Sequence, residues 1–240
     1  MKYFSLVIFL KLYISFYAWG QNVKIEINNL IPKLKEDEKE ALKVWESYLY
    51  NFNMKNYEKS KFWSEHEKKK YQVPDIDLVD IAIASKGFTK YYPLILNIQK
   101  IDSLFIIKTA FVDNTDSSTT IHSIYNVIVK KENGTYKMFR HFDYFSKDWL
   151  SKSYNKFKIY HNKNYIISKD QISKIDSFNH YLSSFFKTDI IPFELYIFPS
   201  TEARLKAKGY DYNYLMYNSI HVSCDVDPYS KIIYSGNGTA

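Results

Sequence analysis

Four apolar segments in the first two thirds of this 240-residue chain constrain its fold most strongly. The first two are separated only by Asp102-Ser103, and Asn133-Gly134 supplies a tight turn between the last two. Alternating apolar and polar residues joined by Asn-Gly turns are typical of β-hairpins. The pattern therefore predicts an antiparallel, four-stranded meander. Its segments are Leu94–Ile101, Leu104–Phe111, Ile121–Lys130 and Tyr136–Phe145.

Two helical segments precede these strands. Over residues 35–53, apolar side chains recur at steps of three and four, and Glu36, Asp37 and Glu38 suit the positive end of a helix dipole. A second helix is predicted over 57–71 and ends before Pro74. Helices followed by an antiparallel sheet predict an α+β fold built in layers. The apolar stripe of the first helix contains Leu42, Trp45, Tyr48, Leu49 and Phe52.

This order of elements resembles the NTF2-like or cystatin-like class over residues 35–147. The resemblance implies a curved sheet that wraps around a helix and leaves a pocket. It rests on the order of helices and strands rather than on a specific motif.

A smaller α/β part is predicted over 148–240. Ser168-x-x-Gln171 is a capping box for a helix to about Lys187, and a strand over Phe193–Phe198 follows. Ser200 begins another helix, which stops at Gly209. Two short strands are predicted near the end of the chain, over Ser219–Cys224 and Lys231–Ser235, with Phe157–Tyr160 as an earlier one.

Residues 168–240 resemble the leading part of a gluzincin, or peptidase MA-like, domain. In that family the next element is a helix with the zinc-binding sequence HExxH. This sequence contains no HExxH, and His66-Glu67 has Lys70 where the second histidine would stand. The resemblance therefore implies a truncated or degenerate relative, to which no catalytic or metal-binding residue can be transferred. No cofactor is expected either.

The N-terminus has the order of a secretory signal. An apolar run follows Lys2, and Ala18-Trp19-Gly20 places small residues before Gln21. A membrane anchor is the alternative, but the uninterrupted apolar stretch is shorter than the roughly 18–20 residues that a spanning helix needs. We expect cleavage after Gly20, secretion or periplasmic location, and no stable membrane span in the mature protein. Residues 21–34 form a lead-in segment.

Charge and cysteine content exclude two further classes. Loss of the signal lowers the formal charge from +7 to +5, and the remaining lysines are interleaved with acids. Arginine, which DNA- and RNA-binding proteins favour, occurs only at Arg140 and Arg204. We therefore expect no nucleic-acid partner. Cys224 is the only cysteine, so an internal disulfide is excluded, and a buried apolar role is predicted for it.

Two groups of residues are candidate binding sites. Strand alternation would place His141 and Asp143 on one face with Phe139 and Phe145, and Arg140 and Tyr125 are further members of the same predicted pocket. These side chains could supply a general base, or they could form a polar pair at the rim of the sheet. The second group is Tyr210, Tyr212 and Tyr214, whose rings suit a carbohydrate or peptide surface. Ordinary packing of a loop is the alternative.

These observations predict an exported, noncatalytic binding or scaffold protein with an unknown ligand or cell-envelope partner. The alternative is a fragment of a zinc-dependent peptidase whose metal-binding helix would lie beyond residue 240.

Overall fold

The computed structural model describes residues 23–52, 61–84, 87–113, 118–217 and 224–236. The expected signal peptide lies outside these residues, as does most of the strand expected over 219–224. Contacts between Cα atoms divide the chain into two compact units. The first comprises residues 1–140 and Tyr210–Asn213, and the second comprises His141–Gly209 and Tyr214–Ala240.

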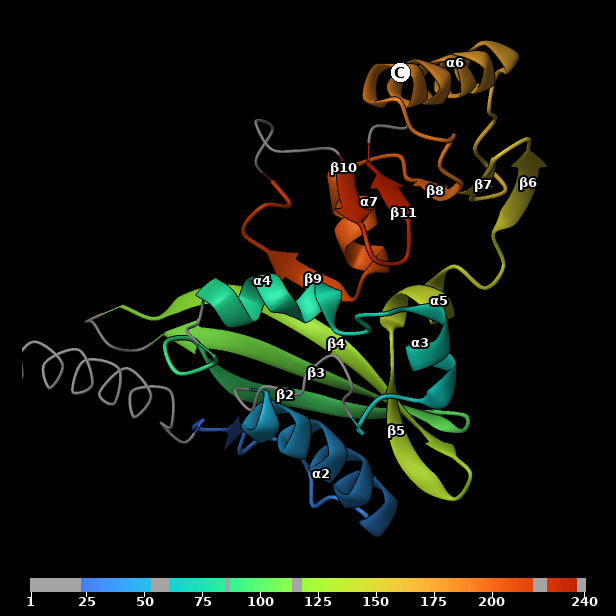
Figure 1. Ribbon diagram of the computed structural model, residues 1–240. Coiled ribbons are helices and arrows are strands. Elements are labelled where there is room, and N and C mark those ends of the chain that lie inside the picture. Colours follow the sequence, from blue (N-terminus) through green and yellow to red (C-terminus); the bar gives the residue numbers. More distant parts are fainter. Residues whose placement is uncertain (1–22, 53–60, 85–86, 114–117, 218–223, 237–240) are drawn as a thin grey trace, which may run out of the picture. The chain divides into compact units, whose positions relative to one another are not determined.

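Within its described residues, the first unit is a six-stranded sheet with three helices (Figure 1). Its strands follow the order β1-β2-β3-β4-β5, and β9 also pairs with β4. The pairs from β2 to β5 are antiparallel, which confirms the predicted meander, whereas β1 runs parallel to β2. The strands are β1 (Glu26–Ile27), β2 (Tyr92–Ile101), β3 (Leu104–Asp113), β4 (Thr120–Glu132), β5 (Thr135–Phe139) and β9 (Tyr210–Asn213).

Helix α2 (Glu36–Asn51) confirms the first predicted helix and packs on this sheet. The Glu38 carboxylate accepts a hydrogen bond from the Lys35 backbone N–H at 2.7 Å, which satisfies a donor at the start of the helix. One face of the helix is buried, and its Trp45 Nε1–H donates to Thr109 Oγ1 on β3 at 2.9 Å. The predicted apolar stripe is therefore the face that meets the sheet. Its buried members are Ala41, Leu42, Trp45, Tyr48 and Leu49.

The second predicted helix is wrong in extent. Helix α3 spans only Glu65–Lys70, because Ser64 caps it by accepting a hydrogen bond from the Glu67 N–H. Just before the cap, Trp63 forms an isolated bridge to Met138 of β5. Helix α4 (Ile76–Ala84) was not predicted. Its sequence is apolar with only two acids and therefore lacks the one-sided pattern of a surface helix.

The strand predicted to run to Phe145 is also wrong. Strand β5 ends at Phe139, and His141–Phe145 forms the short helix α5. The Phe142 carbonyl accepts hydrogen bonds from both the N–H and the Oγ–H of Ser146, each at 2.9 Å. These bonds close a helical turn where the strand pattern would have continued.

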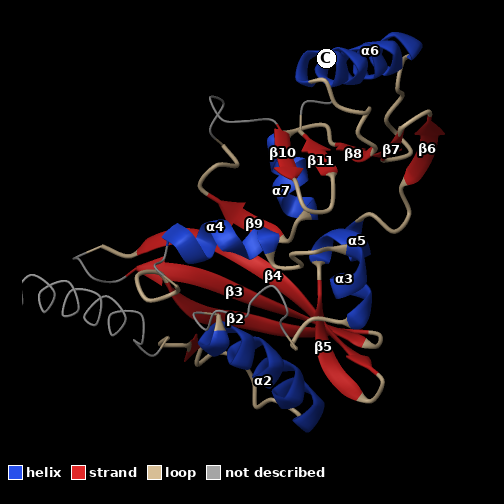
Figure 2. Ribbon diagram, viewed as in Figure 1, coloured by secondary structure: helices blue, strands red, loops and turns tan. Residues whose placement is uncertain are grey.

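The second unit contains a five-stranded sheet in the order β10-β11-β8-β7-β6 (Figure 2). Strands β7, β8 and β11 are parallel, and an antiparallel strand lies at each edge. The predicted strand near residue 157, the strand near 193 and both helices are confirmed. The elements are β6 (Leu150–Tyr154), β7 (Phe157–His161), α6 (Lys169–Phe186), β8 (Phe193–Ile197), α7 (Thr201–Ala207), β10 (Cys224–Asp227) and β11 (Ile232–Ser235).

The two faces of this second sheet are covered differently. On one face, Ile172 and Ile175 of α6 pack against a cluster formed by Phe157, Ile159, Leu195 and Ile197. On the other face, Tyr160, Tyr196 and Tyr234 stand in register across the three parallel strands. The rings of Tyr160 and Tyr196 stack with centroids 4.3 Å apart, and Phe142 of α5 contacts Tyr196 edge-on at 4.7 Å. Across the described residues, both units together confirm a mixed α+β fold.

Candidate functional site

A row of three side chains crosses the inner face of the first sheet. Thr109 and Tyr125 are direct partners on β3 and β4, and Tyr125 is the partner of Tyr210 on β9. Residues directly opposite each other share a face of the sheet. Thr109, Tyr125 and Tyr210 therefore all lie on the face that α2 covers, where Trp45 donates its hydrogen bond to Thr109. The rings of Tyr125 and Tyr210 meet edge-on with centroids 5.1 Å apart. This row forms the floor of a buried polar cluster.

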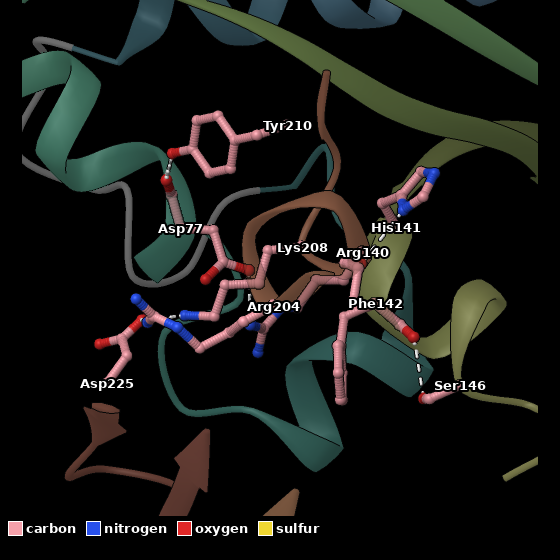
Figure 3. A network of polar contacts seen from close by, with 10 residues as sticks. Asp77, Arg140, His141, Phe142, Ser146, Arg204, Lys208, Tyr210 and Asp225 are labelled. Carbon is pink, nitrogen blue, oxygen red and sulfur yellow. Dashed lines mark hydrogen bonds and ion pairs between the residues drawn. The ribbon is translucent and has the colours of Figure 1, made fainter. Parts of the chain in front are cut away.

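An ion pair between Arg140 and Asp77 is the central contact of that cluster (Figure 3). Arg140 follows β5, Asp77 lies in the first turn of α4, and Nη2 is 2.6 Å from Oδ2. Only 1% of the Arg140 side chain and 3% of the Asp77 side chain are exposed. The guanidinium also lies over the Tyr71 ring, 4.1 Å from its centroid, and the Tyr210 hydroxyl donates to the Asp77 backbone carbonyl. The Asp77 carboxylate and the Tyr71 ring therefore hold the Arg140 guanidinium from two sides.

Two further acids are buried in the first unit. Glu67 and Asp75 have no exposed surface, and the Tyr48 hydroxyl donates to Asp75 Oδ2 at 2.9 Å. Burial raises the pKa of the Tyr125 phenol, and the negative charge of Asp77 raises it further, whereas Arg140 acts in the opposite direction. Tyr125 is therefore a neutral phenol at physiological pH and not a base.

Sequence reasoning missed Asp75, Asp77 and Glu67 as members of this cluster. Two acids flanking Ile76, directly before an apolar segment, were the available signal. Acids in that position suit a helix N-terminus and would have drawn attention to α4.

The predicted placement of His141 and Asp143 on one strand face is wrong. Both lie on α5 in the second unit, where residues two apart are separated by about 200° around the helix axis. His141 Nδ1 is 3.1 Å from the Ala207 carbonyl oxygen, and its ring stacks on Phe145 with centroids 6.4 Å apart. Of the predicted pocket residues, only Arg140 and Tyr125 share the buried cluster.

The three predicted surface tyrosines also separate. Tyr210 is buried, because β9 pairs with β4 and directs its ring inward, so its assignment to a surface is wrong. Tyr212 is half-buried, and Tyr214 is exposed and belongs to the second unit.

A β-bulge in β9 creates a polar group on the outer face of the first sheet. Tyr210 and Tyr212 are paired with the consecutive residues Tyr125 and Ile124, so Asp211 is the extra residue. Asp211 Oδ1 accepts a hydrogen bond from Asn126 Nδ2 at 2.9 Å, and Oδ2 is 2.5 Å from Lys108 Nζ. Asn126 and Lys108 are direct partners on β4 and β3, and in sequence they respectively follow Tyr125 and precede Thr109 of the inner row. The bulge therefore turns both Asp211 and Tyr212 outward.

The second unit has a basic cluster beside its single thiol. Arg204 and Lys208 of the α7 region both form ion pairs with Asp225, and Lys208 Nζ lies 4.3 Å from the Tyr234 ring centroid (Figure 3). Cys224 is half-buried, and this burial raises the pKa of its thiol despite the two nearby cations. His221, three positions before Cys224 in the sequence, lies outside the described residues.

Helix α6 carries exposed aromatic rings on its outer side. Phe178, Tyr181 and Phe185 stack successively, with centroids 6.5 Å and 6.0 Å apart. These rings and Phe186 are each at least 60% exposed. Contiguous apolar surface of this kind is typical of regions that contact another molecule.

The described residues contain no group arranged to bind a metal ion, and comparisons with known proteins assign no family to the chain. No group of three or more His, Cys, Asp or Glu side chains within the described ranges is arranged to hold a metal ion. No described helix is long and apolar enough to cross a membrane. No protein-family model matches the chain, and comparisons with curated proteins and with solved structures also gave no match.

Proposed function

We propose that this chain is an exported, noncatalytic binding protein whose first unit is NTF2-like. The observation that carries the proposal is the enclosure of Arg140 between the Asp77 carboxylate and the Tyr71 ring. A general acid or base must reach a substrate and titrate near the working pH. Arg140 stays charged, Asp77 is held in a solvent-shielded ion pair, and Tyr125 stays neutral. Arg140, Asp77 and Tyr125 thus act in stability.

Two outward-facing features of the chain support a binding function. The first is the outer-face group around Asp211, and the second is the aromatic side of α6. Both offer side chains to solvent, and a folded chain gains little stability by exposing large aromatic rings.

Export is tested by expressing the full chain with its own N-terminus in a bacterial host. Intact-mass measurement of the exported fraction should give a protein that begins at Gln21. A matched variant with Ala18→Leu and Gly20→Leu should stay uncleaved, because bulky residues at these positions block signal processing. A wild-type protein that retains Met1 in the cell interior would contradict the proposal.

The absence of catalysis is tested on the purified mature protein. Chromogenic ester, glycoside and peptide substrates should show no turnover above buffer. Turnover that disappears in a folded Asp77→Asn variant would overturn the noncatalytic assignment, because that change keeps the shape of the side chain and removes its charge.

A further inference from the structure

The outer face of β4 carries a continuous strip of aromatic and polar side chains, here named the β4 strip. Ile124 and Asn126 alternate along the strand and therefore share this face, and His122 is the extra residue of a β-bulge opposite Phe111 and Val112. Each has a neighbour from another segment: the Tyr91 ring lies 4.9 Å from the His122 ring, Tyr212 pairs with Ile124, and Asp211 bonds to Asn126. The strip comprises Tyr91, Lys108, His122, Ile124, Asn126, Asp211 and Tyr212.

The β9 bulge is what completes the β4 strip. On a regular strand, Asp211 and Tyr212 would point to opposite faces of the sheet. The extra residue places both on one face, so a carboxylate stands directly beside a flat ring. Bulges are frequent at sheet edges and next to active sites, where they redirect a side chain in this way.

The polar members of the β4 strip are held in fixed directions. Asn126 is 6% exposed, and its amide is anchored on Asp211. The side chains of Asp211 and Lys108 are 42% and 39% exposed. Each carboxylate oxygen can accept more than one hydrogen bond, and an ammonium group carries three N–H donors. A ligand would therefore meet acceptors and donors whose positions are set before it binds.

This combination matches the chemistry of a sugar. A sugar ring has an apolar C–H face that can lie on an aromatic ring, and its hydroxyl groups both donate and accept hydrogen bonds. Because a strand rises about 3.3 Å per residue, the steps from His122 to Asn126 span at most about 13 Å across the bulge at His122. That length exceeds one sugar ring and suits a short chain of them.

A peptide fits the β4 strip less well. Extended peptides bind sheets chiefly through backbone hydrogen bonds to an exposed edge strand. The groups of the β4 strip are side chains on a face of the sheet, and β4 is already paired with β3 on one side and with β5 and β9 on the other.

We propose that the β4 strip binds a neutral oligosaccharide, with Tyr212 stacking on a sugar ring and Asp211 and Lys108 bonding to its hydroxyl groups. The inference rests on the proposed binding function and names its ligand class. Asn126 acts as a positioning residue through Asp211.

The test is isothermal titration of the mature protein with maltohexaose, cellohexaose and hexa-N-acetylchitohexaose. At least one of the three should bind. Tyr212→Ala and Asp211→Ala should each weaken that binding by about tenfold or more, because central aromatic and charged contacts dominate binding energies. Tyr50→Ala is the matched control, since Tyr50 is a half-exposed tyrosine of the same unit on α2 and should leave the affinity unchanged.

Three results would overturn the site: no binding of any of the three sugars, an equal loss in Tyr50→Ala, or preferential binding of an extended peptide such as reduced, carboxymethylated insulin B chain. Circular dichroism of each variant separates loss of binding from loss of fold. An uncleaved signal, or chemical conversion of the bound sugar, would contradict the proposed function and leave the binding site intact.

Discussion

Arg140 and Asp77 form an ion pair at 2.6 Å from which water is almost completely excluded. Removing one partner of such a pair leaves a buried charge without its counter-ion. We expect Arg140→Met to lower the free energy of unfolding by about 3–5 kcal/mol. The double variant Arg140→Met, Asp77→Leu should be more stable than Arg140→Met alone, because it removes both charges. Urea unfolding followed by circular dichroism measures both effects.

The control for this pair is Lys174→Met on α6. Lys174 and Asp170 form an ion pair at 2.8 Å in which both side chains are largely exposed, so its loss should leave the urea midpoint unchanged. Equal effects of Arg140→Met and Lys174→Met would show that the buried pair does not anchor the first unit.

The exposed rings of α6 should contribute little to stability. Phe185→Ser is expected to change the free energy of unfolding by less than about 1 kcal/mol, as for other exposed positions. Ile159→Ala, which creates a cavity in the core of the same unit, should cost about 2–5 kcal/mol. The two variants are compared by urea unfolding. A cost for Phe185→Ser as large as that for Ile159→Ala would mean that the ring is covered in the folded protein.

His122 should make the protein less stable in mild acid. Burial lowers the pKa of the His122 ring, and the nearby Lys90 lowers it further. The unfolded chain then binds more protons than the folded chain as the pH falls below about 6.5, so stability decreases through that range. In His122→Gln, the drop in urea midpoint between pH 8 and pH 5 should be smaller than in wild type. An unchanged drop, or an NMR titration of His122 above its ordinary pKa, would contradict this prediction.

Cys224 should react slowly with disulfide reagents. Its pKa is raised chiefly by burial, and Asp225 adds to the effect while Arg204 and Lys208 reduce it. At pH 7.5 we expect modification by 5,5′-dithiobis(2-nitrobenzoic acid) to be about tenfold or more slower in the folded protein than in urea, because the thiolate is the reacting form. Asp225→Asn should accelerate the reaction. A folded-state rate equal to that in urea would contradict the prediction.

Local signals in the sequence were enough to predict the caps and turns of several elements. The Ser168–Gln171 box closes with hydrogen bonds of 3.0 Å and 3.1 Å, and Ser200 caps α7 through the Ala203 N–H. Asn133 and Gly134 both have positive φ, as their tight turn requires. In each case the residues that determine the structure are only a few positions apart.

The site depended on distant partners and was therefore predicted only in part. The sequence pointed to Arg140 and Tyr125. Asp77, the partner of Arg140, lies 63 residues before it, and Tyr210, which donates a hydrogen bond to the Asp77 backbone carbonyl, lies 133 residues after Asp77. Nothing near Tyr210 in the sequence indicates that it pairs with β4. The end of β5 was misjudged for the opposite reason, since the aromatic alternation around His141 fits a strand until the Ser146 bonds close a helical turn.

The late position of β9 in the sequence determines when the first sheet is completed during synthesis. Synthesis proceeds from the N-terminus, and the first sheet lacks β9 until residue 213 has been added. At about 5–20 residues per second, the intervening residues 141–209 occupy roughly 3–14 seconds. During that interval the β4 edge from Ser123 to Tyr125 has no β9 partner. A gene truncated anywhere before residue 210 would leave this edge without β9, so an N-terminal fragment does not contain the whole first unit.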